Sequence, residues 1–207
     1  MGRYIGPNCK LCRRENQKLF LKAEKCFSQK CPIEKGRKFA PGQHGKKPIK
    51  LSEYGRRLRE KQKLKRMAQL TEEQLKRYFE LAKKQKGLVG ENLLKLIETR
   101  LDNVVYKLGW ALSRKSARQL VSHKHILVND KPVNIPSYQV KIGDKIKLVD
   151  ELKGNIYVEK SQERTSFIPK WIKYDPENYT AEILSMPTRE DISFPINELL
   201  IVEFYSK

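Results

Sequence analysis

The sequence predicts an α+β protein, because helical and strand-type patterns occupy separate stretches of its 207 residues. Apolar residues recur at helical spacing between residues 71 and 122, and residues typical of helix caps flank these stretches. From residue 126 onward, short apolar runs alternate with turns, as in a small β-sheet. Four cysteines within the first 31 residues predict an N-terminal segment that a metal ion stabilises.

The net charge of +20 predicts a polyanionic partner, with nucleic acid as the first choice and an anionic membrane as the second. Residues 1–66 hold 21 Lys and Arg against 5 Asp and Glu, whereas residues 149–207 hold 7 against 11. The N-terminal third therefore carries the nucleic-acid footprint, and the C-terminal quarter is expected to face protein or solvent. No apolar run approaches the ~20 residues of a membrane-spanning helix, and no signal peptide is evident, so we expect no membrane partner.

The cysteines follow a C-x2-C, gap of thirteen, C-x4-C pattern, formed by Cys9, Cys12, Cys26 and Cys31. In a reducing compartment this spacing favours a metal over disulfides. Four thiolates close a tetrahedral structural zinc site and leave no position open for catalysis. An iron–sulfur cluster is the second choice, since the ligand set alone does not exclude it, and four unliganded thiols are the third.

Residues 34–50 are rich in Gly, Pro and cations and show no period, so we expect a loop that approaches phosphates closely. Ser52 is the predicted N-cap of a strongly cationic helix over residues 53–67, which we expect to need a polyanion on its outer side. Thr71 and Gln74 predict a capping box for the next helix. It ends at Gly87, and a further helix precedes residue 98.

Residues 98–122 predict two short helices. The first has an apolar stripe and ends at Gly109, and Ser113 caps the second. The second helix has an apolar face and, opposite to it, a face with three cations. We expect this cationic face to lie against a polyanion; its residues are Arg114, Lys115 and Arg118.

The remainder predicts strands and turns. Residues 126–128 lead into a hairpin turn at residues 129–131, and residues 138–140 are expected to pair with residues 145–149. Residues 171–175 and 181–187 predict two strands joined by a turn, with Trp171 favoured as a core anchor over a base-stacking platform. The apolar C-terminal stretch is ambiguous between strand and helix.

The sequence contains little that indicates a catalytic site, so we expect no enzyme activity and no small-molecule substrate. The sequence has no nucleophile elbow, no phosphate-binding Gly-Lys-Ser/Thr loop and no acid pair among apolar residues. All three histidines lie in basic segments, which suits phosphate contact better than acid–base chemistry.

Several motifs resemble one known family. RLDNVVYKLG, SARQLVSHKHILVN and VNIPSYQVKIGDKI resemble the RNA-binding module named after small-ribosomal-subunit protein S4, and FAPGQHG and LSEYGRRLREKQK resemble the same family independently. The resemblance implies a helical domain over residues 46–97 that residues 185–207 complete. The S4-type module with a following β element is inserted at 98–184, and the cysteine segment covers residues 1–45.

The resemblance also implies a function. Family members are structural proteins that bind 16S-type small-subunit rRNA, clamp a helix junction in its 5′ domain and nucleate subunit assembly. They contact ribosomal protein S5 and other small-subunit proteins, affect translational accuracy and lie near the channel through which mRNA enters. A cytoplasmic location, in the small ribosomal subunit, follows.

The residues that we expect to contact rRNA are Arg3, Arg37, Lys38, His44, Lys47, Lys50, Tyr54, Arg57, Lys61, Arg114, Lys115, Arg118, Gln119, His123 and Lys124. The family commonly has glycine where Lys124 and Asp130 stand, and LKRMAQL departs from its usual tyrosine-glycine turn. Many family members lack the cysteines.

Two alternatives belong to other classes. The S4-type module also occurs on RNA-modifying enzymes, although residues 149–207 are too few for a separate catalytic domain. A zinc-dependent DNA regulator would use residues 98–122 as a helix-turn-helix and would form a symmetric dimer.

Overall fold

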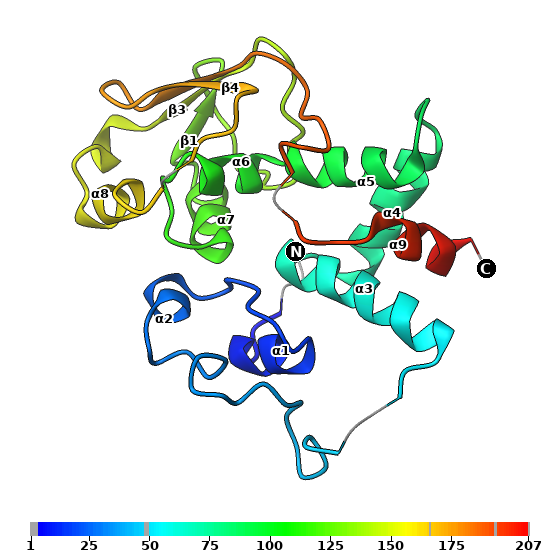
Figure 1. The fold of residues 1–207 in the computed structure, drawn as a ribbon. Helices are drawn as coiled ribbons and strands as arrows, with labels where there is room; N and C mark the ends of the chain where they lie inside the picture. Colours follow the sequence, from blue (N-terminus) through cyan, green and yellow to red (C-terminus); the bar gives the residue numbers. More distant parts are fainter. Residues whose placement is uncertain (1–3, 48–49, 166, 193, 207) are drawn as a thin grey trace. The chain divides into compact units, whose positions relative to one another are not determined.

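The protein is described here by a computed structural model that covers residues 4–47, 50–165, 167–192 and 194–206 (Figure 1). Helices and a small antiparallel sheet make up the described chain, which confirms the α+β prediction. Two compact units are present. Unit 1 comprises Met1–Leu93 with Phe194–Lys207, and unit 2 comprises Leu94–Ser193. The three domains expected from the sequence stay a prediction.

Unit 1 is helical. Its elements are α1 (Asn8–Arg14), α2 (Ala23–Phe27), α3 (Glu53–Met67), α4 (Glu72–Lys83), the first half of α5 (Val89–Glu98) and α9 (Glu198–Tyr205). Ser52 caps α3 by accepting a hydrogen bond from the backbone N–H of Gly55 at 3.1 Å. The capping box of α4 is present as predicted, with Thr71 and Gln74 each accepting from the other's backbone N–H.

The C-terminal segment is a helix, which resolves the ambiguity of its sequence. Helix α9 packs on α3, as the resemblance implies. The Tyr205 ring stacks on Phe79 of α4 at 4.7 Å, and the Phe204 ring lies 5.7 Å from Tyr54 of α3. The apolar run of residues 199–202 is compatible with either structure, and these aromatic contacts favour the helix.

Unit 2 contains the sheet and the helices that cover one of its faces. After the second half of α5 come α6 (Leu101–Lys107), α7 (Arg114–Ser122), the 3₁₀ helix η1 (Asp150–Leu152) and α8 (Ile156–Gln162). The strands are β1 (Ile126–Val128), β2 (Lys131–Pro132), β3 (Lys145–Leu148), β4 (Ile172–Asp175) and β5 (Thr180–Ile183), in the antiparallel order β2-β1-β3-β5-β4.

The core of unit 2 lies between α6, α7 and the sheet. It is formed by Leu101, Val104, Val105, Ala117, Val121, Ile126, Ile146, Leu148, Ile172, Ala181 and Ile183, with Trp110 and Trp171. Trp171 is 2% exposed, so the prediction that it anchors the core is confirmed. The hairpin β4–β5 also confirms the expected strand pair.

One strand pairing was predicted wrongly. Strand β3 pairs with β1 and β5, whereas residues 138–140 lie against the start of α6. The carbonyl of Tyr138 accepts from Leu101 N at 2.8 Å, and Val140 N donates to the carbonyl of Thr99 at 3.0 Å. The carboxylate of Asp144 accepts from Lys141 N at 2.8 Å and holds the turn that directs β3 to β1. Residue alternation predicts strands but does not specify their partners.

The hairpin turn predicted near residue 130 is present as a two-residue turn. Asn129 and Asp130 connect β1 to β2 with φ angles of +50° and +62°. Positive φ at both positions is characteristic of a type I′ turn, which suits the twist of the flanking strands. The side chain of Asn129 accepts from Lys145 N at 2.9 Å and donates to Asp144 at 2.9 Å. Its side-chain bonds therefore tie Asn129 to β3, while Asp130 is exposed and also has a positive φ.

We expect Asp130→Gly to stabilise unit 2 by about 0.5–1 kcal/mol, because glycine adopts this φ without the cost that an L side chain incurs. Asp130→Ala retains a Cβ and should bring no gain. Urea unfolding followed by circular dichroism measures both. Equal stability of the two variants would show that backbone strain at this turn is negligible.

Candidate nucleic-acid interface

The first group of expected RNA contacts lies between the last cysteine, Cys31, and α3. Arg37, Lys38, His44, Lys47 and Lys50 are all exposed. These five side chains are hydrogen-bond donors that can reach phosphate oxygens, and all belong to unit 1. Arg3, which was also expected to contact RNA, lies outside the described residues.

This loop is held by close packing near its middle. The side chain of Arg13 lies over the Phe39 ring at 5.0 Å and donates to the Phe39 carbonyl at 3.2 Å. A Cβ at Gly45 would lie 1.8 Å from the carbonyl oxygen of Ala40, so only glycine fits there. The FAPGQHG motif thus encodes a fixed turn, and the cations on either side of it are displayed from a supported backbone.

Helix α3, which we expected to need a polyanion on its outer side, has anionic partners within its own unit. Carboxylates of unit 1 pair with most of its cations. Arg59 and Arg66 bind Glu15, Lys61 and Lys65 bind Glu72, Arg57 binds Glu203, and Lys63 binds Glu60. The side chain of Glu15 is only 3% exposed. Burial raises the pKa of Glu15, although Arg66 and Arg59 act to lower it.

Three expected contacts on α3 differ in accessibility. Tyr54 is 61% exposed and available to RNA. Arg57 is half-buried, with Nε 2.6 Å from Glu203. Lys61 is 4% exposed, its ammonium lying 4.3 Å from the centre of the Phe204 ring and bonded to Glu72. Lys61 therefore joins α3 to α4 and α9, which is a structural role.

The second group lies in unit 2, on α7 and the loop after it. Ser113 caps α7 as predicted, accepting from Ser116 N at 3.2 Å. Gln119, His123 and Lys124 are exposed and Lys115 is half-buried. They extend the helix face into the loop, where the rings of His123 and His125 lie 6.0 Å apart. This surface has the donors and cations for phosphate and sugar contacts.

Arg118 corrects the prediction for α7. It is 7% exposed and lies with the buried residues of the helix, so the three cations do not share one exposed face. The helical period fixes the angles between side chains but not which neighbouring elements cover them. A change at Arg118 is therefore expected to disturb the fold as well as any RNA contact.

Arg114 is positioned by a buried network that the sequence analysis missed. Its Nε donates to Oδ1 of Asn103 at 3.0 Å, and its guanidinium lies 4.5 Å from the centre of the Tyr106 ring. Asn103 Nδ2 donates to the Glu98 carboxylate at 2.9 Å and to its carbonyl at 3.1 Å. Glu98 is fully buried and also binds Lys107. The motif RLDNVVYK supplies three members of this network, and its polar residues within an apolar helix were the available signal.

Lys124 has a φ of +64°, in the left-handed region that glycine adopts without cost and other residues seldom adopt. Asp130 and Gln69, the latter in the LKRMAQL stretch, also have positive φ. At position 124 the side chain adds a cation to the exposed loop.

The four cysteines lie in one segment of unit 1. Cys12, Cys26 and Cys31 are buried and Cys9 is partly exposed. Burial raises the pKa of the Cys12 thiol, and the other three cysteines raise it further, since each is near enough to act on its charge. The Lys22 N–H donates to the sulfur of Cys26 at 3.2 Å. The donor chemistry therefore suits a metal. Even so, no group of three or more Cys, His, Asp or Glu side chains among the described residues is arranged to hold an ion.

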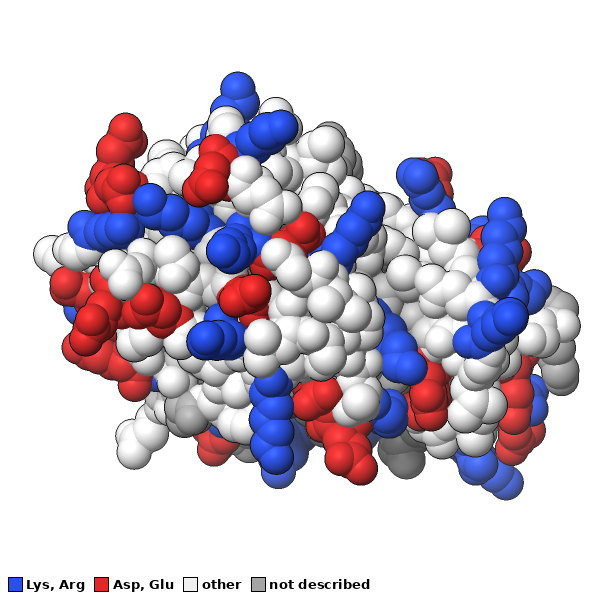
Figure 2. All heavy atoms as spheres, turned by 90° about the horizontal axis from the view of Figure 1, so that it is seen from above, with Lys and Arg blue, Asp and Glu red and all other residues white. Residues whose placement is uncertain are grey.

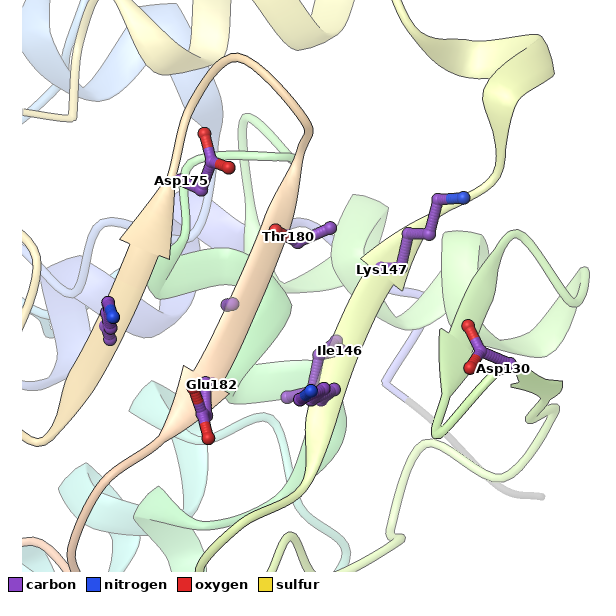
Figure 3. A pocket seen from close by; sticks show the side chains of 9 residues that line it. Asp130, Ile146, Lys147, Asp175, Thr180 and Glu182 are labelled. Carbon is purple, nitrogen blue, oxygen red and sulfur yellow. The ribbon is translucent and has the colours of Figure 1, made fainter.

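The outer face of the sheet has a hollow with mixed charge (Figure 3). Lys147, Thr180 and Asp175 are cross-strand neighbours in one row, and Lys145, Glu182 and Lys173 are neighbours in the next. The three lysines are balanced by three carboxylates, because Asp130 also lines the hollow. This balance does not favour RNA. Figure 2 shows one face of the molecule, on which Asp and Glu side chains interrupt the Lys and Arg side chains.

Within the described part of the chain, no helix has both the length and the apolar character required to cross a membrane.

Comparison with known proteins gives consistent matches over the chain. Residues 3–98 match the family described as ribosomal protein S4/S9 N-terminal domain, and residues 99–146 match the S4 domain. The small ribosomal subunit protein uS4 of Dictyoglomus thermophilum is 56% identical over 207 residues, covering 100% of both chains. Those of Caldicellulosiruptor saccharolyticus and Acetivibrio thermocellus are 56% and 52% identical, again over 100% of both chains.

Proposed function

The chain belongs to the small ribosomal subunit protein uS4 family, and from this premise we propose that its two exposed cationic groups clamp a helix junction in the 5′ domain of 16S-type rRNA. The family is a structural, rRNA-binding component of the small ribosomal subunit and not an enzyme, which removes both alternatives from other classes. Two observations carry the proposal. One is the exposed cations of residues 37–47, and the other is the α7 surface, formed by Lys115, Gln119, His123 and Lys124.

The mechanism is positional. Exposed cations neutralise phosphates and release counterions, which supplies most of the affinity. The supported turn at Gly45 and the Glu98–Asn103–Arg114 network each hold the cations of their own unit, so each group selects RNA whose phosphates match it. Recognition is of shape, and base sequence has a minor part.

The junction clamp would nucleate assembly of the subunit, since it fixes RNA helices before later proteins bind. The acidic balance of residues 149–207 supports contacts with protein, among them ribosomal protein S5. Through that contact, and through a place near the channel where mRNA enters, the protein would affect translational accuracy.

Nuclease footprinting on small-subunit rRNA tests the junction clamp. We expect the full-length protein to protect one helix junction in the 5′ domain. Affinity should fall about a thousandfold or more between 50 and 200 mM salt if six or more phosphates are contacted. Duplex DNA of equal length is the control competitor and should compete poorly. Equal competition by DNA, or absence of protection at low salt, would contradict the proposal.

We also propose that the four cysteines bind one structural zinc ion. Their burial, their mutual electrostatic effect and the N–H group directed at Cys26 support this. The positive charge of zinc would offset the negative charges of the four thiolates. An iron–sulfur cluster is the second choice.

Metal analysis of the purified chain tests this second proposal. About one zinc per chain is expected, and Cys12→Ser and Cys26→Ser should each abolish it, whereas Ser28→Ala, close to Cys26, should retain it. A chain that is folded and free of zinc and iron after growth with both metals would refute metal binding.

A further inference from the structure

Two phenylalanines of the N-terminal segment form an exposed aromatic pair that no function yet explains. The rings of Phe20 and Phe27 lie 5.4 Å apart with an interplanar angle of 32°. Phe20 is 39% exposed and Phe27 is 68% exposed, even though each covers part of the other. Phenylalanine is seldom this exposed, because burying its ring is worth about 1.5–3 kcal/mol.

The backbone directs both rings outward. Leu19 and Leu21 are 0% and 3% exposed, so Phe20 alone of the three residues faces solvent. Its φ of +50° is unusual for a bulky side chain and costs about 1–2 kcal/mol. Phe27 follows the buried Cys26 at the end of α2. Such a strained and exposed arrangement is not explained by packing, and backbone strain of this kind concentrates at functional sites.

The surroundings of the pair are cationic. Residues 18–30 hold four lysines and one glutamate, a net charge of +3. Lys22, Lys25 and Lys30 are exposed, while Lys18 is paired with Glu34. Aromatic faces set among lysines are the combination by which proteins bind unpaired nucleotides, with the ring stacking on the base and the ammonium groups neutralising phosphates.

We propose that Phe20 and Phe27 are a stacking platform for an unpaired base of the bound RNA, with Lys22 and Lys25 at the neighbouring phosphates. The inference rests on the proposed rRNA binding and adds a contact of a different kind. Folded RNA displays unstacked bases in loops and bulges, where aromatic side chains reach them. An apolar protein partner would use the rings but would leave the exposed lysines without counterparts, so the charge favours RNA.

Phe27→Leu tests the platform, because leucine keeps an apolar side chain and removes the aromatic face. Stacking is worth about 1–3 kcal/mol per base, so affinity for a 5′-domain rRNA transcript should fall roughly five- to 150-fold. The salt slope should stay unchanged, since no charge is lost. Lys22→Ala with Lys25→Ala should instead reduce that slope. Phe27→Trp should restore affinity, and its fluorescence should be quenched by RNA, because both native tryptophans are buried.

Tyr157→Leu is the matched control, since Tyr157 is 72% exposed on α8 in unit 2, beside Glu159. It should leave affinity unchanged. Circular dichroism checks that every variant is folded. If wild-type protein protects rRNA but Phe27→Leu binds equally well and Phe27→Trp is not quenched, the platform is refuted while the proposed function stands. If the wild type itself protects no rRNA, the proposed function fails first.

Discussion

Reversing the two lysines at the ends of the α7 surface, Lys115→Glu with Lys124→Glu, is expected to weaken rRNA binding on the order of 100-fold at 150 mM salt. Each change removes a cation and adds an anion that repels phosphate, so about two counterion-release contacts are lost and the salt slope falls accordingly. Lys115 is half-buried and Lys124 is exposed, and both lie on the surface that α7 and its following loop form. Filter binding over a range of salt concentrations measures both quantities.

The control for this variant is Lys160→Glu with Lys170→Glu, which makes the same change of net charge at two exposed positions of unit 2. These positions lie outside the segment that matches the S4 domain. A general effect of net charge would weaken both variants alike, and that result would remove α7 from the RNA interface. Arg118 is left unchanged in this design, because its burial would mix a loss of fold with a loss of binding.

Glu98→Ala is expected to have the largest effect on stability, about 3–5 kcal/mol, because it leaves Lys107 and Asn103 without their buried partner. The variant should also weaken RNA binding, since Asn103 then no longer fixes the guanidinium of Arg114. Guanidinium unfolding followed by circular dichroism measures the first effect. Filter binding without denaturant, at a temperature where the variant stays folded, measures the effect on RNA affinity.

Glu177→Ala removes an exposed carboxylate of the same unit and should change stability by less than about 0.5 kcal/mol. Glu98→Leu combined with Lys107→Met replaces the buried pair with apolar groups and should recover part of the lost stability. A Glu98→Ala variant as stable as the wild type would mean that the buried network contributes nothing to the fold.

Local features of the fold were predictable from the sequence because their causes are local. The caps at Ser52, Thr71 and Ser113 and the turn at Asn129–Asp130 each depend on residues within four positions of one another. The partner of β3 was not predictable in this way, since apolar alternation is the same whichever strand lies alongside. The Asp144 carboxylate accepts from Lys141 N and from Asn129 Nδ2, contacts that a local pattern does not reveal.

The candidate interface shows the same limit. Exposure of the cations in the loop of residues 37–47 follows from a segment without an apolar face. The burial of Lys61 depends on Glu72 and on Phe204. Phe204 lies 143 positions after Lys61 in the sequence. Arg118 likewise looks like a surface residue on a helical wheel. Only contacts between distant segments distinguish a cation that binds RNA from one that stabilises the fold, and periodicity does not report them.

The carboxylates around α3 have a consequence for the newly made protein. Glu15, Glu60, Glu72 and Glu203 pair with cations of the helix, so we expect unit 1 to fold before it meets a ribosome. Ionic strength should then act on two separate properties. High salt would release the protein from its ribosomal site yet leave the released molecule folded, ready to join another subunit under construction.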